Sequence, residues 1–285
     1  MRVVVTGSEG FLGRYLVQAL VQREYNVVRY DLQLGRDILD HRQLIESLTG
    51  ATACIHLAAV ADLYVADEDP EAAEEVNVRG TACVLDACDQ LGVRLLYAST
   101  CCVYGNNGAA KCDEDSAAHP TELYARTKLD GEKLVRESAQ PHSILRLATF
   151  YGPGMRPSLA TSKFLQAARD GKPILIHGTG DQTRCFTHVS DICSGIIEIL
   201  KRPTFHGTIN ISDAREVSVN ELASIAMEVA GREVPTLTAP DRDGQIYRSA
   251  IDNRRLLDMG WRPRWTIEEG MRQCALAMNV EQRDD

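Results

Sequence analysis

Short runs of apolar, mostly β-branched residues alternate with longer amphipathic stretches along the chain. The run "RVVVTG" is followed by "FLGRYLVQALVQRE", whose apolar positions recur at helical spacing. The alternation continues through "NVVRYD", "DHRQLIESL", "ACIHLAA", "VRLLYAS" and "SILRLATFYG". It predicts right-handed βαβ units and a parallel sheet with helices on both faces. We therefore expect an α/β fold with a doubly wound parallel sheet.

The alternation changes after Gly152, where the Gly/Pro/Ser-rich stretch "YGPGMRPSLATS" begins. We expect residues 1–150 to form the domain that contains the parallel sheet and residues 151–285 to form mainly a smaller C-terminal lobe. Elements near residues 185–212 are expected to return to the main sheet. A helix is predicted from Glu71 to Leu91, because acidic residues lie in its first turn and Gly92 follows its end.

Composition and charge limit the kinds of binding partner and the cellular location that we expect for the protein. The chain has 285 residues, 44% of them hydrophobic, which suffices for a sizeable core, and a net charge of −9, which disfavours nucleic acid. No apolar run is long enough to span a membrane, and the first residues do not resemble a signal peptide. The nine cysteines show neither a C-x-x-C motif nor zinc-ligand spacing, which predicts reduced thiols in a cytoplasmic protein without a metal site.

Three glycines mark a candidate phosphate-binding turn in "VVVTGSEGFLG". Gly7 is suited to a tight turn, Gly10 to close approach of a pyrophosphate, and Gly13 to close packing of helix on strand. Asp31 follows 18 residues later, at the end of the next strand, where it can bind the ribose hydroxyls of NAD and repel a 2′-phosphate. An ordinary tight turn and a capping aspartate are the alternatives, and Arg36 nearby leaves the choice between NAD and NADP open.

A tyrosine and a lysine form a candidate proton shuttle in "LYARTKLDG". Tyr124 and Lys128 are four residues apart, so they share one face of a helix. The lysine charge is expected to lower the pKa of the phenol from about 10 toward neutrality, which suits proton transfer during hydride transfer to nicotinamide. An exposed helical pair is the alternative. The order of glycine turn, acidic strand end, Ser99–Thr100 and Tyr-x-x-x-Lys is much more specific than the pair alone.

This order, together with "TGSEGFLG", "IHLAAVAD" and "NVRGT", resembles the extended short-chain dehydrogenases/reductases. Within them it is similar to the NAD-dependent epimerases and dehydratases of nucleotide sugars, and the resemblance covers nearly the whole chain. It implies a Rossmann-type domain that binds NAD and a C-terminal substrate-binding lobe. The cofactor contacts that it implies come from Gly7, Gly10, Phe11, Leu12, Gly13, Asp31, Asp37, Ile38, Leu57, Ala58, Ala59, Asn77, Ser99, Tyr124 and Lys128.

The resemblance also implies a catalytic triad and a substrate site. Thr100 occupies the place of the hydroxyl that binds the substrate oxygen, beside Tyr124 and Lys128. Thr149 stands where relatives have an asparagine that contacts the diphosphate-sugar. Two arginines, Arg184 in "GTGDQTRCFTHVSD" and Arg242 in "DRDGQ", are suited to the diphosphate, with solvated surface charges as the alternative.

Cys101 and Cys102 follow Thr100, where relatives that dehydrate a hexose carry Asp–Glu. A thiol is a poor proton donor to a leaving hydroxyl and this stretch offers no carboxylate, so dehydration is disfavoured. Cys102 matches a catalytic cysteine of GDP-fucose synthase, but the histidine that accompanies it there is missing from the loop after Gly152. We expect Cys102 to line the substrate pocket as a small apolar residue.

The resulting hypothesis is an NAD-dependent nucleotide-sugar epimerase that oxidises C4, lets the ketosugar rotate and reduces it again. One alternative is an NAD(P)-dependent reductase or dehydrogenase of a 4-ketosugar, another sugar or a small alcohol, which Thr149 favours. Another is a non-catalytic protein that senses the cofactor, which the intact triad disfavours. The resemblance further implies a homodimer formed through the helices at residues 71–91 and 123–138.

Overall fold

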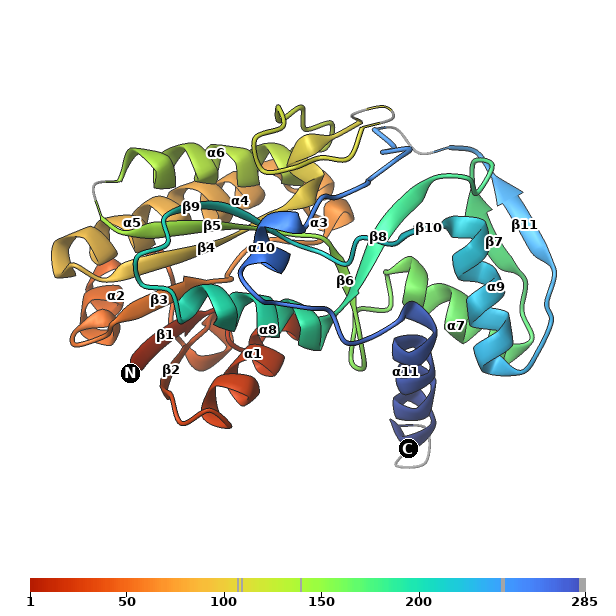
Figure 1. Ribbon diagram of the computed structural model, residues 1–285, viewed down its shortest axis with the longest axis horizontal. Helices are drawn as coiled ribbons and strands as arrows, with labels where there is room; N and C mark the ends of the chain where they lie inside the picture. The colour runs from red at the N-terminus through yellow and green to blue at the C-terminus, as the bar shows by residue number, and fades with distance from the viewer. Residues whose placement is uncertain (107, 109, 139, 242–243, 282–285) are drawn as a thin grey trace.

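Six parallel strands form the central sheet of the larger part of the molecule (Figure 1). The structure is a computed structural model that describes residues 1–106, 108, 110–138, 140–241 and 244–281. The strands are, in spatial order, β2 (Asn26–Tyr30), β1 (Arg2–Thr6), β3 (Ala53–His56), β4 (Arg94–Thr100), β5 (His142–Leu147) and β9 (Gly207–Ile211). All neighbouring pairs are parallel. The predicted α/β fold is confirmed.

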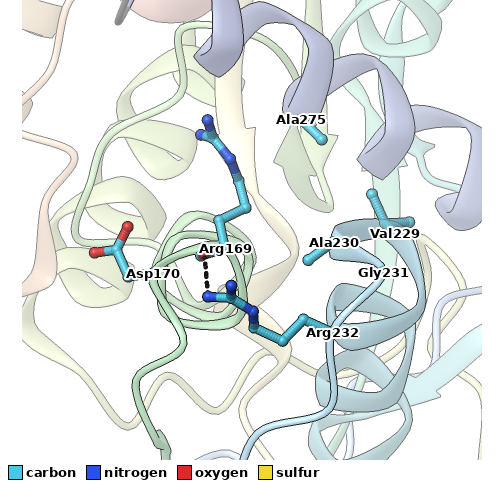
Figure 2. Close-up of a pocket in the computed structure, with 7 residues that line it drawn as sticks. All are labelled: Arg169, Asp170, Val229, Ala230, Gly231, Arg232 and Ala275. Carbon is cyan, nitrogen blue, oxygen red and sulfur yellow. Dashed lines mark hydrogen bonds between the residues drawn. The ribbon is translucent and has the colours of Figure 1, made fainter.

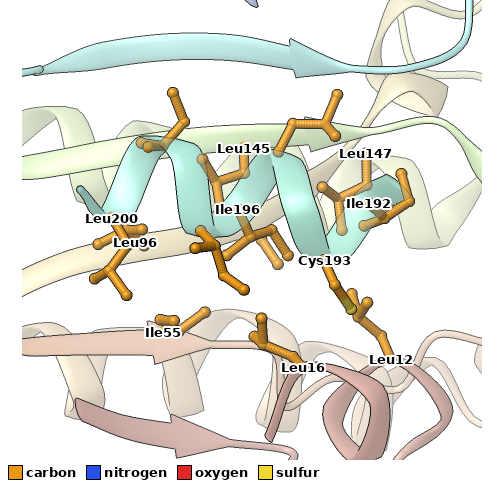
Figure 3. Packing of buried hydrophobic residues seen from close by; sticks show 14 of the residues in the cluster. Leu12, Leu16, Ile55, Leu96, Leu145, Leu147, Ile192, Cys193, Ile196 and Leu200 are labelled. Carbon is orange, nitrogen blue, oxygen red and sulfur yellow. The ribbon is translucent and has the colours of Figure 1, made fainter. Parts of the chain in front are cut away.

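Helices cover both faces of this sheet, because successive strand residues point to opposite sides. On one face, α1 (Phe11–Val21) and α8 (Val189–Leu200) share a core with Val3 and Val5 of β1. Figure 3 shows Ile192, Ile196 and Leu200 of α8 beside Leu145, Leu147 and Leu96 of the sheet. The other face buries Val4 beneath the helices α2 (His41–Leu48), α5 (Gly80–Leu91) and α6 (Leu123–Glu137).

The predicted helix from Glu71 to Leu91 is present as three consecutive helical segments. They are α4 (Pro70–Glu74), the π-helical turn η2 (Glu75–Arg79) and α5. Gly92 ends α5 with φ +65°, a left-handed conformation that favours glycine. The π-turn inserts one wide turn into the helix and contains Asn77, which therefore points inward.

A smaller lobe lies to the right in Figure 1. Its two sheets have the strand orders β10-β8-β6 and β11-β7. Its strands and helices are β6 (Thr149–Tyr151), α7 (Ala160–Asp170), β7 (Ile174–His177), β8 (Thr183–His188), β10 (Glu216–Ser218), α9 (Val219–Ala230), β11 (Thr236–Ala239) and α11 (Ile267–Glu281). The lobe has a core of its own, which includes Leu165, Val217, Leu222 and Met271.

The chain returns from this lobe to the large sheet. After β8, which belongs to the small lobe, α8 packs beside α1 and β9 extends the sheet next to β5. Leu256 of α10 (Arg254–Asp258) and Trp261 also lie in the large core. We therefore propose a division near residue 150, with α8, β9 and α10 assigned to the first domain. Among the described residues, no helix combines the length and apolar character needed to cross a bilayer.

Candidate active site

The turn after β1 leaves space for a phosphate because its glycines carry no side chains. Gly7 has φ +67°, and a Cβ there would lie 2.7 Å from the backbone nitrogen of Ala58. A Cβ on Gly13 would lie 2.0 Å from the Gly7 carbonyl oxygen. Gly10 precedes α1 without a side-chain cap, so the first amides of that helix, at Phe11 and Leu12, remain suited to an anion. The turn fits the pyrophosphate of a dinucleotide.

Asp31 lies beside this turn, at the carboxyl end of β2. Its Oδ2 accepts a hydrogen bond from the Glu9 backbone N–H at 2.9 Å, and its Oδ1 accepts one from Gln33 N–H at 3.0 Å. These bonds hold the carboxylate where an adenosine ribose is expected. Arg36 Nη1 donates to Ser47 Oγ of α2 at 2.7 Å, so this guanidinium is bonded to a different part of the fold.

Asp37 and Ile38, the residues predicted to flank the adenine, form a rigid turn after β2. The Asp37 carbonyl accepts a hydrogen bond from the Tyr30 hydroxyl at 2.6 Å, and its Oδ1 accepts one from Leu39 N–H at 2.9 Å. The Ile38 side chain is buried against Gly80, where a Cβ would lie 2.4 Å from Ile38 Cδ1. An adenine contact from Ile38 would therefore come from its backbone.

The loop after β3 contains the predicted channel residues Leu57, Ala58 and Ala59, all half-buried. Ala58 N–H donates to Thr6 Oγ1 at 3.3 Å, and Gly7 packs against the backbone of the first two residues. The loop is therefore fixed directly beside the glycine turn. This placement suits a cofactor that extends from the turn along the sheet edge.

Two residues predicted to touch the cofactor, Asn77 and Ser99, are buried and hydrogen-bonded to the protein. Asn77 is 0% exposed: its Oδ1 accepts from Val60 N–H at 2.8 Å, while its Nδ2 donates to the Val60 carbonyl and to Thr127 Oγ1. Ser99 is 3% exposed and donates to Glu132 Oε1 at 2.6 Å. A cofactor contact from Asn77 or Ser99 stays a prediction, and it would have to involve groups other than these bonded side-chain atoms.

The candidate catalytic residues meet where β4 ends against the first turn of α6. Thr100 is the last residue of β4, and its hydroxyl lowers the pKa of Tyr124, so the two side chains lie close together. Lys128 is buried one helical turn further along α6, with its Nζ 4.2 Å from the centre of the Tyr97 ring. The Tyr97 hydroxyl donates to the Lys128 carbonyl oxygen at 3.2 Å. The structure therefore brings together the three residues that the sequence identified.

The protonation of this pair differs from the expectation. Burial raises the pKa of Tyr124 well above its usual value, the nearby Cys102 adds to this, and Arg156 and the hydrogen bond with Thr100 oppose it. Burial lowers the pKa of Lys128 to about 7, against the opposing charge of Glu132. The predicted lowering of the pKa of Tyr124 is therefore wrong for this structure. Removal of water outweighs nearby positive charge, and the Lys128 ammonium lies over Tyr97.

A buried ion pair lies close to the candidate catalytic residues. Glu132 accepts hydrogen bonds from Arg146 Nε at 2.9 Å and Nη2 at 2.8 Å, and from Arg136 Nη2 at 2.8 Å. Burial raises the pKa of Glu132, but the bonds and charge of Arg146 outweigh that effect and lower it. A permanent negative charge consequently lies one turn from Lys128 and favours its protonated form.

The two adjacent cysteines have different surroundings. Cys101 is buried and donates from Sγ to the Arg146 carbonyl oxygen at 3.4 Å. Cys102 is half-buried, and its backbone N–H donates to Thr100 Oγ1 at 3.1 Å. Burial and the negative charge of Glu122 raise the pKa of Cys102, while Thr100 and Arg184 lower it less. Both thiols are therefore protonated near neutral pH.

Glu122 is a carboxylate that the sequence argument missed. It is the N-cap residue of α6, two positions before Tyr124, and its charge raises the pKa of both Cys102 and Tyr124. The stretch around the cysteines lacks an acidic group, but the fold brings this one close. Its only sequence signal was its position directly before the catalytic helix.

Two of the predicted substrate residues, Arg184 and Thr149, lie on strands of the small lobe. Arg184 is on β8 and donates from Nη1 to the Thr183 carbonyl at 2.8 Å, and its charge lowers the pKa of Cys102. Thr149 is half-buried and begins β6, where it pairs with Phe186 of β8. Arg242 lies outside the described residues.

Arg156 is a second residue that the sequence argument missed. It lies in the loop between β6 and α7, with Nη1 3.2 Å from Asp62 Oδ2, which also accepts from Ser158 Oγ at 2.9 Å. Its charge lowers the pKa of Tyr124, so it lies near the catalytic phenol. The small lobe thereby binds the loop after β3 at the side of the site. The sequence could have pointed to Arg156, because it is the only positively charged residue of the stretch "YGPGMRPSLATS".

A cavity of about 420 Å³ in the small lobe lies apart from these groups (Figure 2). It is lined at the ends of α7 and α9 by Arg169, Asp170, Val229, Ala230, Gly231 and Arg232, and by Ala275 of α11. Arg232 Nη1 donates to the Arg169 carbonyl oxygen at 3.0 Å. None of the predicted site residues lines it. Within the described residues, no His, Cys, Asp and Glu side chains gather to hold a metal, and no disulfide forms.

Comparison with known proteins identifies the family. The sequence pattern of the NAD dependent epimerase/dehydratase family matches residues 3–212. The chain belongs to this family. An uncharacterized UDP-glucose epimerase of Bacillus subtilis is 31% identical over 266 residues, covering 82% of this chain and 83% of that protein. A probable UDP-glucuronate 4-epimerase of Rhizobium meliloti is 26% identical and covers 95% of each chain.

Solved structures agree with this assignment. MoeE5 in complex with UDP-glucuronic acid and NAD has a TM-score of 0.91 at 29% identity, covering 99% of this chain and 100% of that one. The UDP-glucose 4-epimerase of Thermus thermophilus in complex with NAD has a TM-score of 0.89 at 26% identity, covering 98% and 99%. The protein is an NAD-dependent enzyme, and its glycine turn and Asp31 fit that cofactor.

Proposed function

We propose that the protein is a nucleotide-sugar 4-epimerase whose catalytic residues are Thr100, Tyr124 and Lys128. The observation that carries the proposal is the placement of Thr100 at the carboxyl end of β4 beside α6, which bears Tyr124 and the buried Lys128. The glycine turn lies at the same edge of the sheet, because parallel strands end on one side. The relatives named for UDP-glucose and UDP-glucuronate epimerisation support a UDP-hexose or UDP-hexuronate as substrate.

Each residue of the triad has a distinct task. Bound NAD supplies a hydride acceptor at its nicotinamide. Tyr124 acts in its deprotonated form, which the charge of Arg156 and the hydroxyl of Thr100 favour. It takes the proton of the C4 hydroxyl and returns it after the ketosugar has turned its other face toward the nicotinamide. Thr100 holds the substrate oxygen, since its hydroxyl both donates and accepts. Lys128, with its pKa near 7, supplies positive charge and a bond to the nicotinamide ribose.

The substrate side is assigned from charge and position. We propose that Arg184 binds the diphosphate, since a guanidinium matches two phosphate oxygens. Arg242 is proposed for the same task by sequence alone. Thr149 and Cys102 are proposed to line the sugar pocket, and Arg156 to face the sugar near Tyr124.

The decisive test is incubation of purified protein with UDP-glucose, UDP-galactose, UDP-glucuronate and matched dTDP- and GDP-sugars, without added NADH. Interconversion of C4 epimers, resolved by chromatography and NMR, is the expected result. Reduced nicotinamide formed in proportion to product would instead indicate the reductase or dehydrogenase. A product lighter by one water would indicate a dehydratase, with Glu122 as the obvious acid or base. Turnover of no substrate would overturn the proposal.

The variant Tyr124→Phe tests whether the Tyr124 hydroxyl transfers the proton. The phenylalanine keeps the ring and removes only the hydroxyl that exchanges the proton. We expect turnover to fall by roughly 10²–10⁴-fold, the usual contribution of general acid–base catalysis. NAD binding should persist, because the glycine turn and Asp31 are untouched. Retained turnover in this variant would rule out the proton shuttle.

We also propose a homodimer and a cytoplasmic location. The first rests on analogy, through helices α4, α5 and α6 on one side of the sheet. The second is supported by the nine cysteines, none of which pairs within the described residues. Light scattering coupled to gel filtration tests the first, and a mass of one chain would contradict it.

A further inference from the structure

An acidic residue inside the glycine turn, Glu9, is paired with an arginine of β2. Arg29 Nε donates to Glu9 Oε1 at 2.8 Å, and its Nη2 donates to Oε2, which makes the pair bidentate. Ser8 Oγ also donates to Glu9 Oε1 at 2.8 Å. The Glu9 backbone N–H meanwhile donates to Asp31 Oδ2 at 2.9 Å. The two carboxylates and the guanidinium therefore form one cluster where the adenosine ribose is expected.

The charges in this cluster bear on the choice of cofactor. The hydrogen bond from Arg29 lowers the pKa of Glu9 despite some burial, and Arg14 adds a smaller effect, so Glu9 is ionised at neutral pH. The Arg29 side chain is 51% exposed and that of Glu9 13%. NADP differs from NAD by a 2′-phosphate on this ribose, and a guanidinium fork is the group that binds phosphate bidentately. In this protein the guanidinium group of Arg29 is instead hydrogen-bonded to the Glu9 carboxylate.

We propose that Glu9 is a second determinant of the preference for NAD over NADP, besides Asp31. It acts by holding the Arg29 guanidinium away from a 2′-phosphate. The proposal concerns the nucleotide site alone. It stands or falls independently of the sugar substrate and of the reaction proposed above.

The test compares NAD and NADP binding by calorimetry, after removal of bound nucleotide, in the unaltered protein, Glu9→Gln, Arg29→Gln and the double variant. Glu9→Gln keeps the side-chain size and releases the guanidinium. It should tighten NADP relative to NAD by ~10-fold or more, a change that corresponds to about 1.4 kcal/mol. Adding Arg29→Gln should abolish the gain. Glu46→Gln, which removes an exposed carboxylate paired with Arg42 on α2, is the control and should leave the ratio unchanged.

Two results would overturn the proposal. One is an unchanged ratio of dissociation constants in Glu9→Gln. The other is a gain that persists in the double variant, since loss of a negative charge alone would then explain it. Glu9→Asp provides a second route if Glu9→Gln does not fold. It keeps the charge but shortens the reach, so a smaller gain is expected, and no gain would equally contradict the role of Glu9.

Discussion

The cofactor end and the substrate end of this site are built in different ways. At the cofactor end, the glycine turn and Asp31 come from the first two strands and act largely through backbone geometry. At the substrate end, the residues proposed to act, Thr100, Tyr124, Arg156 and Arg184, come from four separate segments and would act through their side chains. A local turn is encoded in consecutive residues, whereas a pocket between two lobes depends on how distant segments meet.

The largest loss of turnover is expected from a substitution at the substrate end of the site. Lys128→Met should reduce turnover by roughly 10²–10⁴-fold, because it removes the buried positive charge and the proposed bond to the nicotinamide ribose, one helical turn from Tyr124. The same change should raise the free energy of unfolding near neutral pH, since burial disfavours the ammonium. The pKa of Lys128 is about 7 in the folded protein and 10.5 as its ordinary value. Steady-state kinetics and urea unfolding measure the two effects.

The pH dependence of the free energy of unfolding provides a second test of the lowered pKa of Lys128. Between those two pKa values the unfolded chain binds the extra proton, so the free energy of unfolding should rise with pH in the unaltered protein. That rise should be smaller in Lys128→Met. Equal slopes in the two proteins would show that Lys128 is not strained by burial.

The next largest effect, on NAD affinity, is expected from a substitution at the cofactor end of the site. Gly13→Ala places a Cβ 2.0 Å from the Gly7 carbonyl oxygen, so the backbone must shift. We expect NAD affinity to fall by roughly 10²-fold, about 2.7 kcal/mol, with a stability loss of about 1–3 kcal/mol from overpacking. Calorimetry and thermal unfolding test this. Gly50→Ala is the control: Gly50 has φ +73° but open space around it, so stability should fall while NAD binding does not. Undiminished NAD binding by Gly13→Ala would refute the close packing.

A smaller effect, on the pH dependence of turnover, tests the role of the Arg156 charge at the substrate end. Arg156 lowers the pKa of Tyr124, so Arg156→Gln should raise that pKa and shift the corresponding limb of the pH–rate profile to higher pH. A shift of one unit would reduce turnover on that limb about tenfold. Arg126→Gln, on the exposed side of α6, removes a cation that bonds to the Thr121 carbonyl and should leave the profile in place. Identical shifts in both variants would indicate a general charge effect.

The smallest expected effect concerns Cys102. Its raised pKa keeps the thiol protonated, and its backbone N–H, which a substitution retains, makes the bond to Thr100. Cys102→Ala should therefore change turnover by less than about threefold, well below the loss expected for an acid–base residue. A loss as large as that of Tyr124→Phe would establish Cys102 as a proton donor or acceptor.

Prediction from sequence worked best where a short motif dictates its own geometry. The glycine turn, the helix that ends at Gly92 and the strand that ends at Thr100 are all present. It was less informative for buried polar groups. Asn77 and Ser99 belong to recognisable motifs, but a motif does not reveal whether an amide or hydroxyl faces a ligand or the protein. The direction of the pKa shift at Tyr124 was wrong for a similar reason, since helical spacing does not measure burial.

The sequence by itself determined the α/β alternation, the glycine turn, the acidic end of β2 and the Tyr-x-x-x-Lys pair. Each is a local pattern of backbone preference and side-chain period, which few distant contacts can override. Only the tertiary structure decided that Glu122 and Arg156 adjoin the catalytic pair, that Arg36 is bonded to Ser47, and that Glu9 occupies Arg29. Those arrangements depend on how side chains from different strands, helices and loops meet when the sheet, its covering helices and, for Arg156, the small lobe pack together, which no local sequence pattern specifies.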